Sequence, residues 1–130
     1  LKRADAALVI GDTALTYDGD VPEVYDLAGE WKRFTGLPFV FALWVGHEDV
    51  HLSKYQQDFA ASRDFGLAHV DDIAAEYAPK LSMKPAAVKL YLTQNIDYSL
   101  DEENRQGLRH FYKLSREAGI IAVEKDLYFA

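Results

Sequence analysis

Asp12 is the residue whose place in the sequence most favours a role in chemistry. It follows Gly11 at the end of the apolar run 6–10, which predicts a short buried strand. Ligand sites of open α/β sheets lie at the carboxyl ends of strands, where a carboxylate can bind a substrate hydroxyl. The same pattern also fits Asp12 as the cap of a helical turn that starts at Thr13, so both interpretations stay open.

A second candidate is the segment Thr35-Gly36-Leu37-Pro38, which joins a predicted helix to the most hydrophobic run of the chain. The Leu37–Pro38 step is stiff and Gly36 is mobile, so the segment could be a hinge with Thr35 and backbone amides facing a cleft. A helix C-cap followed by the start of a strand explains the same residues, and spacing alone favours that interpretation.

Residues 47–51 read His-Glu-Asp-Val-His and match the H-E-x-x-H pattern of zinc proteases. In those enzymes a helix presents both histidines and the glutamate acts as a general base. Here the motif directly follows a predicted strand and Gly46, which places His47 ahead of the first helical turn. The context favours exposed surface residues, and we expect neither a metal site nor a cofactor.

Short strands and then helices are the elements that would position these residues. Residues 6–10 and 39–45 are predicted strands; the second does not alternate, so both of its faces would be buried. Residues 23–25 could form a third strand. Asp26 is the predicted N-cap of a helix over 27–34 that ends at Gly36.

After Gly46 the sequence predicts helices only. One covers about 50–65, and a second carries the amphipathic stripe of Val70, Ile73, Ala74 and Tyr77. A third has Pro85 in its first turn, and a fourth is opened by a capping box at 99–102 and closed by Gly119. A central parallel strand needs neighbouring strands on both sides, and this chain offers at most three short strands. Either the fold is small, or the partner strands lie in a missing N-terminal part.

Composition bounds the possible functions. The chain has 130 residues, with 14 Lys and Arg against 21 Asp and Glu, a net charge of −7. This acidity argues against nucleic acid and anionic membranes as partners, and no apolar run approaches the ~20 residues of a membrane helix. There is no cysteine, which excludes disulfides and thiol chemistry. Met83 is the only methionine, so we expect either that something was removed upstream of Leu1 or that the chain is a piece of a longer protein.

Four blocks of the sequence resemble the chorismate dehydratases of the futalosine pathway of menaquinone biosynthesis: 4–15, 25–44, 91–98 and 107–112. The resemblance implies an α/β fold, the two-lobed periplasmic-binding-protein type II fold, of which this chain holds only the C-terminal portion. Residues 1–38 would end the second lobe and form a hinge. Residues 39–130 would supply the return crossover strand and the C-terminal helices of the first lobe.

The resemblance further implies a cytoplasmic lyase that dehydrates chorismate to 3-[(1-carboxyvinyl)oxy]benzoate. Asp12 would be the catalytic residue that binds the ring hydroxyl. Gly11, Thr35 and Gly36 would contact substrate, with Arg33 as a candidate helper. The isolated chain would be inactive without its partner, the missing N-terminal half of the same protein.

Two alternatives remain on the sequence. The same fold serves non-catalytic proteins that bind small anionic solutes. It also serves the related dihydroxynaphthoate synthase of the same pathway, which usually carries a histidine near the position of Gly11-Asp12. No histidine precedes His47 in this sequence, and this difference favours the dehydratase.

Overall fold

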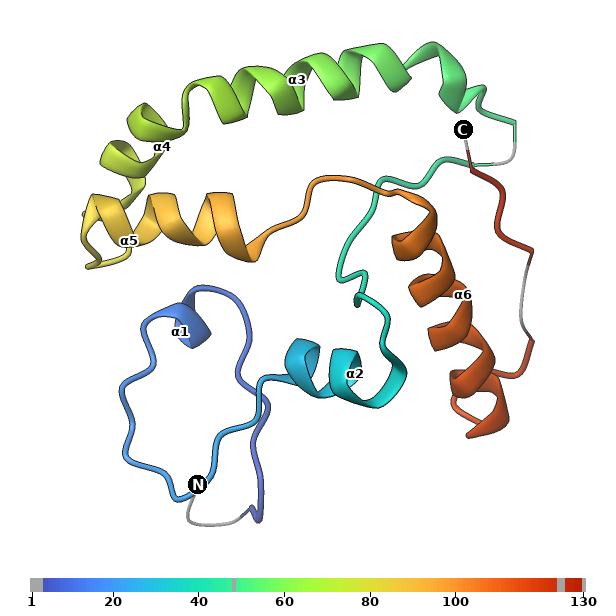
Figure 1. Ribbon diagram of the computed structural model, residues 1–130, viewed down its shortest axis with the longest axis horizontal. Helices are drawn as coiled ribbons and strands as arrows, with labels where there is room; N and C mark the ends of the chain where they lie inside the picture. The colour runs from blue at the N-terminus through green and yellow to red at the C-terminus, as the bar shows by residue number, and fades with distance from the viewer. Residues whose placement is uncertain (1–3, 48, 124–125, 130) are drawn as a thin grey trace. The chain divides into compact units, whose positions relative to one another are not determined.

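The computed structural model describes residues 4–47, 49–123 and 126–129, and these residues form helices joined by extended segments (Figure 1). By contacts the chain divides into two compact units. Unit 1 comprises Leu1–Pro22 and Ser62–Asp97, and unit 2 comprises Glu23–Ala61 and Tyr98–Ala130. The division into lobes at residue 38 is a separate prediction and stays one. The helical elements are α1 (Asp12–Leu15), α2 (Leu27–Thr35), η1 (Leu52–Lys54), α3 (Gln56–Ala68), α4 (Val70–Tyr77), α5 (Pro85–Leu90), η2 (Tyr91–Asn95) and α6 (Glu102–Glu117).

Unit 1 is built around the packing of α4 against α5. Ala74 and Ala78 are 1% exposed and Val88 is 4% exposed, and Leu81, Met83 and Leu92 pack around these three residues. An ion pair of 2.6 Å between Lys89 and Asp71 also links the two helices. The predicted helix at Val70 and the predicted Pro85 start are both confirmed. Tyr77, expected to face inward, is instead exposed.

Unit 2 contains α2 and α6. Both predicted caps of α2 are confirmed: the Asp26 carboxylate accepts a hydrogen bond from Ala28 N at 3.1 Å, and Gly36 ends the helix in the left-handed conformation. In α6 the predicted capping box at Ser99 is wrong. The N-cap is Asp101, whose carboxylate accepts from Asn104 N at 2.9 Å, because this spacing is the one that reaches a free amide of the first turn.

The end of α6 follows the prediction. Gly119 has a φ of 72°, and its amide donates to Arg116 O at 2.9 Å. The next amide, that of Ile120, donates to Ser115 O at 2.9 Å. This pair of bonds is a Schellman motif, which needs a left-handed residue and therefore favours glycine.

The predicted helix over 50–65 is divided. It begins with the short 3₁₀ turn η1, in which Tyr55 N donates to Leu52 O at 2.9 Å, and α3 then runs on to Ala68. Within the described ranges, no helix is long and apolar enough to cross a membrane.

The three predicted strands are not formed in the described part of the chain, where residues 6–10, 23–25 and 39–45 belong to no sheet. A strand exists only when a neighbour supplies its ladder hydrogen bonds, and apolar character alone cannot create that neighbour. The two-lobed α/β fold therefore stays a prediction.

Candidate functional site

Asp12 is the first residue of α1, and Gly11 is its N-cap. The amides of Ala14 and Leu15 donate to Gly11 O at 2.9 and 3.2 Å, and the Gly11 φ of 64° sets the turn into the helix. The alternative in which Asp12 caps the turn is therefore wrong. Its carboxylate is exposed and has no hydrogen-bond partner among the residues that the structure describes. Such a carboxylate is free to accept a hydrogen bond from a ligand.

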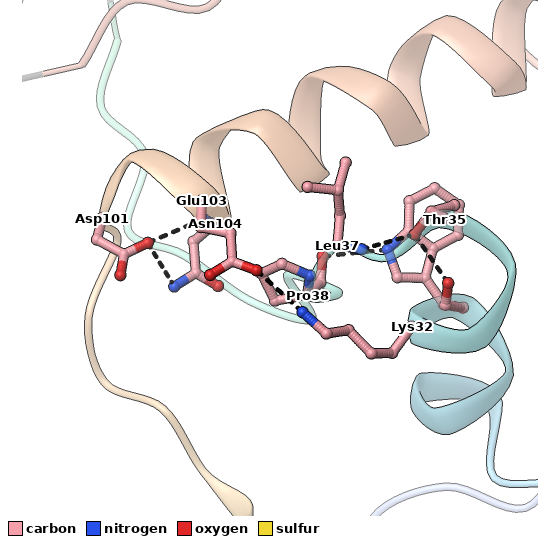
Figure 2. A network of polar contacts seen from close by, with 8 residues as sticks. Lys32, Thr35, Leu37, Pro38, Asp101, Glu103 and Asn104 are labelled. Atoms are coloured by element: carbon pink, nitrogen blue, oxygen red, sulfur yellow. Dashed lines mark hydrogen bonds and ion pairs between the residues drawn. The ribbon is translucent and has the colours of Figure 1, made fainter.

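Thr35 lies in the last turn of α2, where its hydroxyl makes two local hydrogen bonds (Figure 2). It donates to Trp31 O at 2.8 Å and accepts from Leu37 N at 3.1 Å. A threonine hydroxyl has one hydrogen and two lone pairs, so in this conformation Thr35 can offer a ligand only one acceptor position.

Gly36 is the C-cap of α2, and its amide is already hydrogen-bonded. Its amide donates to Lys32 O at 2.8 Å, and its φ is 74°. A Cβ at this position would meet nothing within 4 Å, so the backbone conformation and not lack of space favours glycine. The Gly36 amide would have to leave Lys32 O before it could bind a substrate.

Gly107 in the middle of α6 allows this helix to approach Pro38, and sequence reasoning gave it no role. A Cβ built on Gly107 would overlap the carbonyl oxygen of Pro38. The same oxygen accepts a hydrogen bond from Trp31 Nε1 at 3.1 Å. The signal available in the sequence was a glycine inside a predicted helix, which costs about 1 kcal/mol relative to alanine and often marks close packing.

Aromatic rings surround this junction. The Trp31 ring centroid lies 5.6 Å from Phe39 and 5.8 Å from Phe111, and both pairs are edge-to-face. Phe39 in turn lies 4.8 Å from Phe41 and 5.1 Å from Phe111. Edge-to-face pairs of this kind contribute about 0.5–1.5 kcal/mol each beyond burial. Trp31 therefore packs half-buried among the aromatic rings of unit 2.

An apolar groove of about 610 Å³ opens beside these rings. Phe34 is 77% exposed at its surface, and Arg33 forms an ion pair with Glu30. The volume of the groove falls within the range of small-molecule pockets, and its apolar lining suits a ring more than a highly charged group. The groove is lined by Leu27, Glu30, Trp31, Arg33, Phe34, Phe39, Phe41 and Phe111.

An ion pair joins α2 and α6 on the outside of this junction. Lys32 Nζ lies 2.9 Å from Glu103 Oε1, and Figure 2 shows this contact beside the Asp101–Asn104 cap. The two side chains are 55% and 57% exposed. Exposed pairs of this kind contribute about 0–1 kcal/mol, so aromatic packing and not this pair determines the junction.

The H-E-x-x-H motif does not lie on a helix at the positions that the structure describes. Asp49 and Val50 are in a turn, and His51 precedes η1. His47 Nδ1 lies 2.8 Å from Asp49 Oδ1, and both side chains are exposed. Glu48 lies outside the described residues. His47 and His51 therefore do not lie on one helical face, as the zinc-protease pattern requires.

The predicted site residues fall into two pairs of sequence neighbours. Gly11 and Asp12 belong to unit 1, and Thr35 and Gly36 belong to unit 2. Their assignment to one substrate site stays a prediction.

Comparison with known proteins gives consistent matches. A family model described as menaquinone biosynthesis matches residues 1–117. The chorismate dehydratase of Thermus thermophilus is 32% identical over 130 aligned positions, which cover 85% of this chain and 47% of that protein. The chorismate dehydratase of Campylobacter jejuni is 28% identical over 112 aligned positions, which cover 85% of this chain and 49% of that protein. The chain thus spans about half the length of these curated relatives. No solved structure matches it.

Proposed function

Because this chain belongs to the menaquinone biosynthesis family, we propose that it is part of a chorismate dehydratase. The proposed reaction removes water from chorismate and gives 3-[(1-carboxyvinyl)oxy]benzoate, within the futalosine route. The observation that carries the proposal is the family match over residues 1–117, together with two relatives that bear this name.

The proposed chemistry is an elimination. The ring C–H bond next to the hydroxyl-bearing carbon breaks, its electron pair forms a ring double bond, and hydroxide leaves and takes up a proton to become water. The ring becomes aromatic, so the step is strongly favourable once the proton departs. The protein has to orient a dianion and stabilise the leaving hydroxyl.

Asp12 fits the part of the site that contacts the ring hydroxyl. Its carboxylate is exposed at the start of α1 and has no competing partner among the described residues. We assign it to accept a hydrogen bond from the substrate hydroxyl, next to Gly11, whose positive φ of 64° sets the turn into α1. In unit 2, Thr35 donates its hydroxyl proton to Trp31 O, so it would have to leave that carbonyl before it could donate to a substrate carboxylate. The Gly36 amide contributes only if α2 loosens at its end.

The direct test is an activity assay of a full-length protein. Such a protein contains this chain and also a segment that corresponds to the half of the relatives that this chain does not match. Incubation with chorismate should give an aromatic product detected by ultraviolet absorbance, with a mass lower by one water. Binding of chorismate without conversion would replace the proposal with a solute-binding function. The 130-residue chain alone should show no turnover.

The role of Asp12 is tested in the same protein by Asp12→Asn, with Asp18→Asn as the matched control. Both residues are exposed aspartates of unit 1. Asp12→Asn should lower kcat/KM by about 10- to 100-fold, because it removes a hydrogen bond to a charged group, which is worth about 1.5–3 kcal/mol. Asp18→Asn should leave kcat/KM unchanged. Equal kcat/KM values for the two variants would remove Asp12 from the site.

A further inference from the structure

The aromatic ring of Phe129 lies against two arginines of α6. The chain turns back after this helix (Figure 1), and the ring centroid of Phe129 is 4.9 Å from the guanidinium carbon of Arg105 and 5.2 Å from that of Arg109. Phe129 is half-buried, whereas the preceding Tyr128 is 88% exposed. A guanidinium within about 6 Å of a ring centroid is attracted to the face of the ring. Phe129 therefore fills an aromatic position beside two cations.

The segment 126–129 that carries this ring can leave α6 at low cost. Among the described residues, no amide or carbonyl of the segment makes a backbone hydrogen bond. The helix keeps its own ends, because Asp101 caps its start and the Gly119 amide donates to Arg116 O at its end. A segment held without backbone hydrogen bonds opens more easily than a helix does. Displacement of Phe129 therefore leaves α6 intact.

Arg105 and Arg109 lie one turn apart on α6, and both keep N–H groups that no described residue uses. Arg105 Nε donates to Leu100 O at 3.0 Å, which fixes this half-buried guanidinium. Arg109 Nη1 donates to Glu102 Oε1 at 3.1 Å, and this contact shows that a carboxylate can reach the exposed guanidinium. The remaining N–H groups form planar forks, whose geometry matches the two oxygens of a carboxylate.

We propose that Arg105 and Arg109 form a binding site for a small aromatic carboxylate, and that Phe129 occupies the ring position of this site when no ligand is bound. The ring of the ligand would replace the Phe129 ring, and its carboxylate would accept hydrogen bonds from the guanidinium groups. An aliphatic carboxylate lacks the ring contact, and a neutral ring lacks the acceptors. This proposal does not depend on the reaction assigned to Asp12.

Benzoate is the probe for this site. It is titrated into the 130-residue chain at constant ionic strength, because salt screens exposed charges, and binding is followed by the NMR signals of the arginine Nε–H groups. The signals of Arg105 and Arg109 should shift with one common Kd, and that of Arg63 in α3 should not. Acetate, which lacks the ring, should bind about 5- to 30-fold more weakly, because it loses two cation–π contacts.

Two pairs of variants separate a ligand site from a purely structural contact. Phe129→Ala removes the internal competitor and should tighten benzoate binding by about 5- to 30-fold, whereas Tyr128→Ala in the same segment should leave the Kd unchanged. Arg109→Gln should weaken binding by about 3- to 30-fold, and Arg63→Gln should not.

Four results would overturn the proposal. They are no benzoate-dependent shift at Arg105 and Arg109, an unchanged or weaker Kd in Phe129→Ala, equal Kd values for Arg109→Gln and Arg63→Gln, and acetate binding as tight as that of benzoate.

Discussion

Replacing Gly107 by alanine tests whether the close approach of α6 to Pro38 holds unit 2 together. The added methyl group would overlap the Pro38 carbonyl oxygen, which is a backbone atom and cannot rotate away. The helix would have to move outward, and the hydrogen bond from Trp31 Nε1 to that oxygen, now 3.1 Å, would lengthen or break. Gly66 in α3 provides the matched control, because a Cβ there meets nothing within 4 Å.

The expected magnitude follows from three contributions. Alanine favours the helix by about 1 kcal/mol over glycine. Overpacking opposes this gain by about 1–3 kcal/mol, and the lost hydrogen bond adds a cost of about 0.5–1.5 kcal/mol. Gly107→Ala should therefore lower the free energy of unfolding by about 2 kcal/mol. Gly66→Ala carries only the helix gain and should raise it by about 0.5–1 kcal/mol.

Urea denaturation followed by circular dichroism measures both changes. Trp31 fluorescence reports on the junction itself, because the indole donates to Pro38 O. The opposite signs of the two effects make the comparison independent of the absolute stability of the chain. If Gly107→Ala stabilises the protein as much as Gly66→Ala does, the contact between α6 and Pro38 is not close and the reasoning fails.

Three further changes have directions set by the structure. Val88→Ala should lower the free energy of unfolding, measured by urea denaturation, by about 1–3 kcal/mol, since Val88 is 4% exposed. Leu90→Ala should change it by no more than about 0.5 kcal/mol, since Leu90 is 51% exposed. Equal losses in the two variants would contradict the unit 1 core. Asp101→Ala should lower the stability of α6 by about 1 kcal/mol, because the N-cap acceptor is lost. Asp101→Asn should keep that stability, because asparagine also caps helices. A loss of stability in both variants would show that the charge of Asp101 matters more than its capping. The hydrogen bond to the Glu76 carboxylate raises the pKa of Lys80 above its ordinary 10.5, so this pair stabilises the fold below pH 10.5 and the effect is lost as pH rises through the raised pKa. The Tm difference between the unmodified chain and Lys80→Met should shrink across that range, and a constant difference would exclude the pair as its source.

The helices with clear end signals could be predicted from the sequence. Asp26 and Gly36 bound α2, Pro85 lies in the first turn of α5, and Gly119 ends α6, all as predicted. These signals act within one turn of the chain, through a side-chain oxygen, a fixed φ or a left-handed residue. The error at Ser99 is of the same local kind, because Asp101 two residues later offers an equally suitable oxygen.

The candidate site could be predicted only in part. The sequence indicated Gly11 and Asp12 as a turn with a carboxylate, and the structure places that carboxylate exposed at the start of α1. It also indicated Gly36 as the end of α2, where the Gly36 amide bonds to Lys32 O, but it did not indicate that the Thr35 hydroxyl bonds to Trp31 O and Leu37 N. Those two bonds depend on the rotamer of Thr35, which spacing along the sequence does not determine.

By itself, the sequence determined the family, the main helices and the local turns at their ends, because a run of similar residues and a capping side chain need no distant partner. Tertiary structure decided the role of Gly107 and the packing of Trp31 on Pro38, since both depend on residues far apart in the sequence meeting at one point. It also decided that the apolar segment Phe39–Val45 makes no backbone hydrogen bond among the described residues. A strand forms only where another segment supplies its hydrogen bonds, so apolar sequence is necessary for a buried strand but not sufficient.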